Sequence, residues 1–276
     1  MPLHPRRSGG ISCIRPHPGI LVPAPPRIRQ TGDGPHAVLA LHGWGGGHHT
    51  FDPIRDRLPA SVRLFSVDLP GYGETPAPDA WTVGAMRDTI AAAIDQIDAP
   101  TVTLLGNCSG AIFGLEAALV RPDRIRSAVL IDPFTFTPWY FRLFLWPVVG
   151  RFFYRFTFAN PIGRWITNVA LAGRRDEDTD MTGSFETLDH DAVWQHLRLL
   201  DAIGRVDAYG ALSIPVDVLH GERTFAAVRA GLADWRRIWP GVGVHELPGA
   251  GHLPLQESPD GVARVLADHI AGLGPA

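Results

Sequence analysis

The chain contains 276 residues, of which 45% are hydrophobic, and its formal net charge is −3. This length suits one large domain, or a core with an inserted segment, and allows a sizeable buried core. All 25 basic residues are arginine, which excludes Schiff-base catalysis by a lysine and a P-loop lysine. The near-neutral charge balance also argues against nucleic acid as a partner, since that would need a large basic field.

The first 34 residues predict a loose, basic lead-in with one or two early edge strands. Prolines interrupt its apolar stretch from Pro16 to Pro26, so it lacks the continuous core of a secretory signal. The two cysteines, Cys13 and Cys108, are too few for a disulfide framework. A Cys108 that must stay reduced would favour the cytoplasm, where disulfides are rare.

Short apolar runs alternate with helical patterns along most of the chain. Strands are predicted at residues 37–41, 62–67, 101–105, 127–131, 216–219 and 243–247. Helices are predicted between or after them at residues 82–97, 111–120, 225–239 and 259–271. This alternation predicts an α/β fold with a mostly parallel, doubly wound sheet and helices on both faces. Residues 35–133 and 213–276 would form this core.

Residues 134–212 lack this alternation of strands and helices, which predicts a helical, aromatic-rich lid inserted into the core. Thirteen of the chain's 25 aromatic residues fall between residues 134 and 165. The run 139–146 is more apolar than a small lid can bury, so some of its side chains are expected to bind substrate, namely Trp139, Tyr140, Phe144 and Trp146. Interleaved arginines would suit an acidic headgroup, a carrier phosphate or a membrane surface, and these are Arg142, Arg151 and Arg155.

A tight glycine turn joins the apolar run 101–105 to a helical pattern, and its sequence is Gly106-Asn107-Cys108-Ser109-Gly110. Between a strand and a helix, the middle residue of such a turn sits at a strained apex and points towards substrate. The helix N-terminus and a nearby imidazole would favour a thiolate there. Cys108 is therefore predicted to be a nucleophile, and the alternative is a small buried hydrophobic residue.

Four motifs occur in the order and spacing of one family: His42-Gly43-Trp44-Gly45, Asp68-Leu69-Pro70-Gly71-Tyr72-Gly73, the turn 106–110, and Gly251-His252. Over residues 35–272 the chain therefore resembles the α/β-hydrolases, with cysteine in place of the usual serine. The resemblance implies that His252, in the loop after the last strand, is the catalytic base. It also implies an oxyanion hole formed by the backbone N–H groups of Trp44 and Ser109.

The chain departs from the commoner family pattern at the acid. An aspartate is expected after Gly221-Glu222-Arg223, but Thr224 stands there. Some α/β-hydrolases, haloalkane dehalogenases among them, carry the acid after the strand that follows the elbow helix, where this chain has Asp132. We therefore expect Asp132 to orient His252, with Glu222 as the reserve candidate. A thiol–imidazole dyad with little support from a third group also stays open.

The sequence predicts neither a metal site nor a cofactor. His42, His48 and His49 cluster, but no carboxylate or cysteine partner stands at ligand spacing. The glycine run from Gly43 to Gly47 lacks the GxGxxG spacing of a dinucleotide site.

A thiolate nucleophile narrows the expected chemistry. Its acyl intermediate is a thioester, which exchanges almost isoenergetically with thioester substrates and forms less readily from ordinary esters. The resemblance to cysteine thioesterases and dienelactone hydrolases implies hydrolysis, transfer or ring-forming release of an acyl group. The aromatic lid suits a bulky apolar acyl group, which a carrier protein or coenzyme A would deliver. Two alternatives remain: an ester, lactone or carbon–carbon bond hydrolase, and a binding protein without catalysis.

Overall fold

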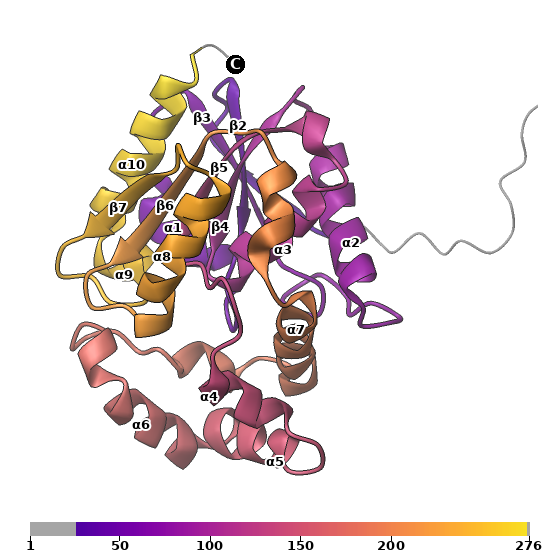
Figure 1. Cartoon of the computed structure of the whole chain (residues 1–276), viewed down its shortest axis with the longest axis vertical. Coiled ribbons are helices and arrows are strands. Elements are labelled where there is room, and N and C mark those ends of the chain that lie inside the picture. Colours follow the sequence, from indigo (N-terminus) through magenta and orange to yellow (C-terminus); the bar gives the residue numbers. More distant parts are fainter. Residues whose placement is uncertain (1–25, 275–276) are drawn as a thin grey trace, which may run out of the picture.

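A seven-stranded sheet forms the centre of the computed structural model, which describes residues 26–274 (Figure 1). The strand order is β1-β3-β2-β4-β5-β6-β7, and every neighbouring pair is parallel except β1 and β3. The strands are β1 (Ile28–Thr31), β2 (His36–Leu41), β3 (Val62–Val67), β4 (Val102–Asn107), β5 (Ile125–Ile131), β6 (Val216–Gly221) and β7 (Gly243–Leu247). The predicted mostly parallel sheet is confirmed.

Helices cover both faces of the sheet, because alternate residues of each central strand are apolar on both sides. In β2, Leu39 and Leu41 belong to one buried cluster, while Val38 and Ala40 belong to a second. The first cluster includes residues of α2 (Val83–Gln96), α3 (Ser109–Ala118) and α8 (Ala226–Ile238). The second includes residues of α1 (Asp52–Arg55), α9 (Pro254–Glu257) and α10 (Pro259–Gly272).

The chain between β5 and β6 leaves the sheet and folds into a group of mostly short helices beyond one end of it (Figure 1). These are α4 (Trp139–Arg142), α5 (Gly150–Tyr154), a π turn (Arg155–Ala159), α6 (Pro161–Ala170) and α7 (His190–Ile203). Local sequence defines two of their starts. Asn160 accepts a hydrogen bond from the N–H of Ile162 at the start of α6, and Asp189 caps α7.

The N-terminal prediction can be followed only in part. β1 lies at the edge of the sheet, antiparallel to β3, in the place of an early edge strand. Residues 1–25 of the expected lead-in, Cys13 included, lie outside the described residues. From residue 26 to residue 274, no helix is long and apolar enough to cross a membrane.

Candidate active site

Cys108 occupies the apex of the turn between β4 and α3, with a φ of 50° and a ψ of −115°. This is a strained backbone conformation for a residue with a side chain, and such strain is typical of functional sites. The glycines on either side are required by packing. A Cβ on Gly106 would lie 2.3 Å from Cα of Ala111, and one on Gly110 would lie 2.2 Å from the carbonyl oxygen of Leu41.

The structure brings His252 and Asp132 together with Cys108. The imidazole of His252 faces the Cys108 side chain, and the two residues line the same cavity. Its Nδ1 lies 2.8 Å from Oδ2 of Asp132. Burial alone would lower the pKa of His252, but its interactions with Asp132 and Cys108 outweigh burial and raise the pKa to about 10. The rings of Phe134 and Phe225 pack edge-on against the imidazole and limit its rotation.

The loop that carries His252 is tied to the segment after α6. The backbone N–H of His252 donates to the carbonyl oxygen of Arg174 over 2.8 Å. The guanidinium of Arg174 in turn donates to the carbonyl oxygen of Thr224 over 3.0 Å. Gly251 donates its N–H to the carboxylate of Glu257. The position of the imidazole therefore depends on both the core and the helical segment.

Asp132 is fully buried and directly follows β5, with a φ of 49°. Its backbone N–H donates to the carbonyl oxygen of Leu219, which continues the pairing with β6. Oδ1 accepts the N–H of Gly221 over 3.1 Å. Oδ2 accepts the hydroxyl of Thr224 over 2.6 Å as well as contacting His252. A buried carboxylate with three such partners is held in one orientation.

Glu222, the reserve candidate for the acid, has a different partner. Its exposed carboxylate accepts the N–H of Gly249 over 2.8 Å. Thr224 instead contacts both Asp132 and His252. Besides donating to Asp132, its Oγ1 lies 3.3 Å from Nδ1 of His252. The sequence showed that Thr224 replaces an expected aspartate, but it gave no signal that the hydroxyl would contact Asp132.

The backbone around Trp44 and Ser109 lies beside Cys108. A Cβ on Gly43 would come within 3.0 Å of the Cys108 Cβ, which shows how closely the loop after β2 approaches the apex. Ser109 is the first residue of α3, where backbone N–H groups have no acceptor inside the helix. The indole N–H of Trp44 donates to the carbonyl oxygen of Val193 on α7 over 2.8 Å, and Trp44 is among the residues that line the adjoining cavity.

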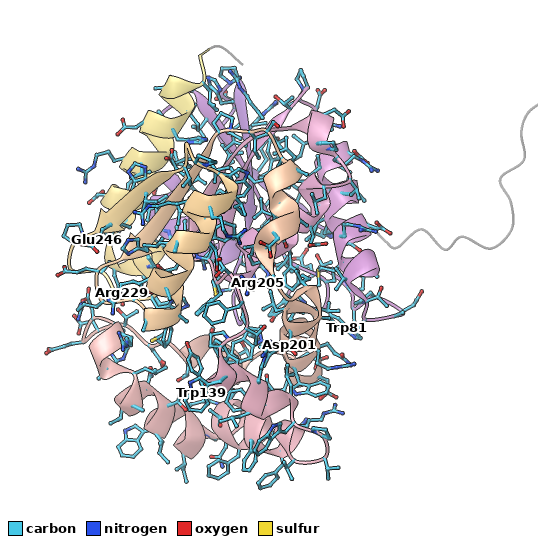
Figure 2. The ribbon with its side chains drawn as sticks, in the orientation of Figure 1. Trp81, Trp139, Asp201, Arg205, Arg229 and Glu246 are labelled. Atoms are coloured by element: carbon cyan, nitrogen blue, oxygen red, sulfur yellow. The ribbon has the colours of Figure 1, made fainter. Side chains whose placement is uncertain are left out.

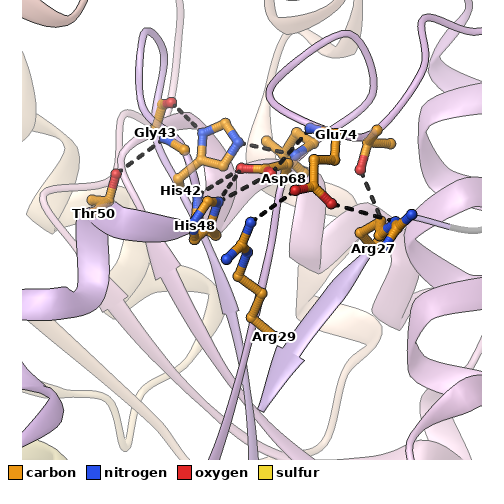
Figure 3. A network of polar contacts seen from close by, with 11 residues as sticks. Arg27, Arg29, His42, Gly43, His48, Thr50, Asp68 and Glu74 are labelled. Carbon is orange, nitrogen blue, oxygen red and sulfur yellow. Dashed lines mark hydrogen bonds and ion pairs between the residues drawn. The ribbon is translucent and has the colours of Figure 1, made fainter. Parts of the chain in front are cut away.

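A buried imidazole holds the start of this loop. Nδ1 of His42 donates to the carbonyl oxygen of Gly43, while Nε2 accepts the N–H of Leu69, both over 2.9 Å (Figure 3). Complete burial lowers the pKa of His42 to about 4, so this ring is neutral at physiological pH. The two hydrogen bonds also define its tautomer. His42 therefore joins the loops that follow β2 and β3.

Asp68 completes the network shown in Figure 3. It accepts the backbone N–H of His48 over 2.7 Å and that of Glu74 over 3.3 Å. Burial opposes ionisation, but these hydrogen bonds and the His48 imidazole hold the pKa of Asp68 below its usual value. Glu74 also pairs with Arg27 and Arg29 at the sheet edge. Among the described residues, no group of three histidine, cysteine or acidic side chains is arranged to hold a metal ion.

A cavity of about 620 Å³ opens between Cys108 and the helical segment. Its lining is mainly apolar and includes Phe134, Tyr140, Phe144, Phe158, Leu200 and Phe225. Trp139 and Trp146, also expected to bind substrate, do not line it and are 73% and 58% exposed. The reason is helical geometry, since consecutive residues of a short helix cannot all face the same side. Figure 2 labels Trp139 on the helical segment.

Comparison with known proteins places the chain among relatives of the same fold. It is 41% identical to a pimeloyl-[acyl-carrier protein] methyl ester esterase of Neisseria meningitidis serogroup B, over 97 residues that span 35% of this chain and 36% of that protein. A protein of the same name from Chromobacterium violaceum is 25% identical over 256 residues, covering 88% of this chain and 97% of the relative.

Solved structures share the fold at low identity. The putative non-heme bromoperoxidase BpoC of Mycobacterium tuberculosis superimposes with a TM-score of 0.77 at 20% identity, covering 93% of this chain and 99% of that one. A thermophilic esterase from Thermogutta terrifontis gives 0.74 at 22% identity, covering 90% and 93%. The model of the alpha/beta hydrolase fold family matches residues 36–259. The chain therefore belongs to the alpha/beta hydrolase fold family.

Proposed function

We propose that the protein is a hydrolase or acyltransferase that acts on a thioester or activated ester of a bulky apolar acyl group. The observation that carries this proposal is the contact chain from Cys108 through His252 to Asp132, at the edge of an apolar cavity of about 620 Å³. In this proposal Cys108 is the nucleophile, His252 the proton-transfer group and Asp132 its positioning partner.

The charge state of His252 supports a cysteine mechanism in particular. A serine hydroxyl needs a neutral imidazole to accept its proton during attack. Asp132 and Cys108 together raise the pKa of His252 to about 10, so the imidazole is protonated at neutral pH when it faces a thiolate, as an ion pair requires. The proton that His252 holds is then available to the leaving group.

The proposed reaction has two steps. The Cys108 thiolate attacks the acyl carbon, and the N–H groups of Trp44 and Ser109 stabilise the negative oxygen that forms. The carbon–sulfur or carbon–oxygen bond to the leaving group then breaks, and the leaving group takes the proton of His252. In the second step the neutral imidazole removes a proton from water, an alcohol or an amine, which attacks the thioester and releases Cys108.

The cavity supports an apolar acyl group, and the relatives support delivery on a carrier. Both named relatives are esterases of a carrier-linked acyl ester. We propose that the acyl chain occupies the cavity and that the carrier, an acyl carrier protein or coenzyme A, remains outside. Residues 134–212 would act as a lid, because their side chains supply much of the cavity lining.

A second candidate is hydrolysis of a carboxylic ester at the far end of a carrier-linked acyl chain. The names of the relatives favour it, since each is a methyl ester esterase. In that case the leaving group is a small alcohol and the carrier thioester stays intact.

Paired substrates distinguish these reactions. We would measure kcat/KM for a thioester and a methyl ester with the same acyl chain, using the wild type, Cys108→Ser and Cys108→Ala. The first proposal predicts a preference of at least about tenfold for the thioester and loss of activity in Cys108→Ala. It also predicts poor rescue by Cys108→Ser, because a serine hydroxyl is far less acidic than a thiol and does not form the thiolate–imidazolium pair. A preference for the methyl ester would favour the second candidate, and full activity of Cys108→Ala would contradict both.

A further inference from the structure

Exposed hydrophobic side chains are concentrated on one part of the molecule. Within residues 26–274, all twelve exposed large hydrophobic side chains lie between residues 136 and 169. Ten of them fall between residues 146 and 169, on α5, the π turn, α6 and the segment just before α5, and we call these ten the apolar face. It includes Val148, Phe152 and Trp165, which are 98%, 67% and 67% exposed. Patches of this kind mark interaction surfaces.

Helix α6 shows that this exposure is organised. Ile162, Trp165, Ile166 and Val169 stand at helical spacing of three and four residues and form one stripe, and all four are exposed. A surface helix normally turns such a stripe towards the core. Away from the stripe α6 is closely packed, since a Cβ on Gly163 would lie 1.9 Å from the carbonyl oxygen of Phe156 in the π turn. Figure 2 shows side chains along the outer edge of α5 and α6 pointing away from the sheet.

Within residues 139–170, which carry the apolar face, every charged side chain is positive. Residues 139–170 contain four arginines and no aspartate or glutamate, in a protein with a net charge of −3. Arg142, Arg151 and Arg155 each leave more than half of their side chain exposed. Their partners, Asp201 and Asp191, belong to α7. Exposed ion pairs of this kind contribute little, so phosphate groups can replace those carboxylates.

The apolar face is continuous with the proposed active site. Ile166 is 49% exposed on the stripe and also lines the cavity, together with its neighbours Thr167 and Ala170. An apolar chain that contacts Ile166 from outside is therefore already at the edge of the cavity.

We propose that the apolar face docks onto the surface of an anionic membrane, with its hydrophobic side chains inserted to headgroup depth and its arginines on lipid phosphates. The exposed stripe on α6 supplies the hydrophobic surface that inserts. The arginines of residues 139–170, a stretch without acidic residues, supply charge complementarity to lipid phosphates. Ile166 belongs both to the apolar face and to the cavity lining. A lipid surface accounts for this arrangement, because apolar substrates partition into membranes. No described helix spans a bilayer, so the contact lies in the plane of the membrane.

Co-sedimentation with vesicles tests this proposal. The full chain would be mixed with vesicles of phosphatidylcholine, with and without phosphatidylglycerol. The apolar variant carries Ile162→Asn, Trp165→Gln and Val169→Asn, three exposed positions that do not line the cavity. A charge variant carries Arg151→Gln and Arg155→Gln. Its matched control carries Arg55→Gln and Arg57→Gln, which are also exposed and ion-paired but lie at the end of α1.

The wild type should bind both vesicle types and prefer the anionic one. The apolar variant should bind at least about tenfold more weakly to both. The charge variant should lose roughly tenfold on anionic vesicles only, and the matched control should bind like the wild type. The apolar variant should hydrolyse a short, water-soluble ester within about twofold of the wild-type rate, and Cys108→Ala should bind vesicles like the wild type. These two controls distinguish a failure of the membrane proposal from a failure of the proposed reaction.

Three results would overturn the proposal. The first is a wild type that does not bind vesicles, or an apolar variant that binds them as tightly. The second is a wild type that forms dimers by light scattering while the apolar variant is monomeric, which would make a second copy the occupant. The third is weaker binding of an acyl carrier protein by the apolar variant with unchanged vesicle binding, which would make the occupant a protein.

Discussion

The hydroxyl of Thr224 donates to Oδ2 of Asp132 over 2.6 Å, and the same carboxylate oxygen contacts His252. Thr224 stands at the position where a family member of the commoner pattern carries its acid. The threonine is fully buried, so its hydroxyl has no access to water and depends on this partner. Thr224 therefore holds the carboxylate of Asp132, although its own side chain carries no acid.

Replacing Thr224 tests that role. Thr224→Val removes the hydroxyl at nearly constant volume, and we expect kcat to fall about tenfold because Asp132 loses one of its fixing hydrogen bonds. KM should stay unchanged, since Thr224 does not line the cavity. Thr224→Ser should restore kcat. Equal kcat values for the valine and serine variants would show that the hydroxyl has no part in positioning.

The pKa of His252 should depend on Asp132. Asp132→Asn removes the charge and weakens the hydrogen bond that raise this pKa, while burial continues to lower it. We therefore expect the pKa to fall from about 10 by several units. Titration of ¹⁵N-labelled histidine by NMR measures the change. A His252 signal that titrates at the same pH in both proteins would contradict the assignment of Asp132.

The same shift predicts a pH dependence of stability. The pKa of His252 is higher in the folded state than its usual 6.5, so protonation stabilises the fold fully below about pH 6.5 and this contribution is lost as the pH rises towards about 10. In urea denaturation, Asp132→Asn should be less stable than wild type at pH 6. The difference should narrow as the pH approaches 10. A difference that does not vary with pH would point to packing alone.

Tyr140 provides a test of substrate contact. Its hydroxyl is buried at the cavity with no hydrogen-bond partner among the described residues, and burial raises its pKa to about 12, so it is a neutral donor. Tyr140→Phe should leave the free energy of unfolding unchanged or raise it by about 1 kcal/mol, while kcat/KM falls roughly fivefold. Unchanged kcat/KM would remove Tyr140 from the substrate contacts.

The glycine turn around Cys108 can be tested through stability. Gly110→Ala should lower the free energy of unfolding by roughly 2–3 kcal/mol, because the new Cβ would lie against backbone. Gly241→Ala is the matched control, since no atom lies within 4 Å of its added Cβ. It should change stability by less than about 0.5 kcal/mol. Similar values for the two variants would contradict the packing argument.

The sheet could be predicted because each central strand is an apolar run between turn residues, as at 62–67 and 127–131. The turn 106–110 could also be predicted, because Gly106 and Gly110 stand where a Cβ would collide with neighbouring backbone. The helical segment was harder to predict. The run 139–146 is apolar at almost every position, so no periodicity indicated that Tyr140 faces the cavity while Trp139 faces outward.

Side-chain contacts between distant elements could not be predicted. Thr224 and Asp132 are 92 residues apart, and their contact depends on the pairing of β5 with β6. The position of Asp132 after β5 was suggested by resemblance, and its burial by nothing in the sequence. The sequence therefore indicated which elements carry the candidate residues, while packing determines which side chains meet.

Intact-protein mass after mixing with acyl thioesters tests the central claim, that Cys108 forms an acyl intermediate. Wild type, Cys108→Ala and Cys13→Ala would be compared. A covalent mechanism through Cys108 predicts a mass increment equal to the acyl group on wild type and on Cys13→Ala, and none on Cys108→Ala. An increment that persists in Cys108→Ala, or turnover of the thioester by that variant, would contradict it.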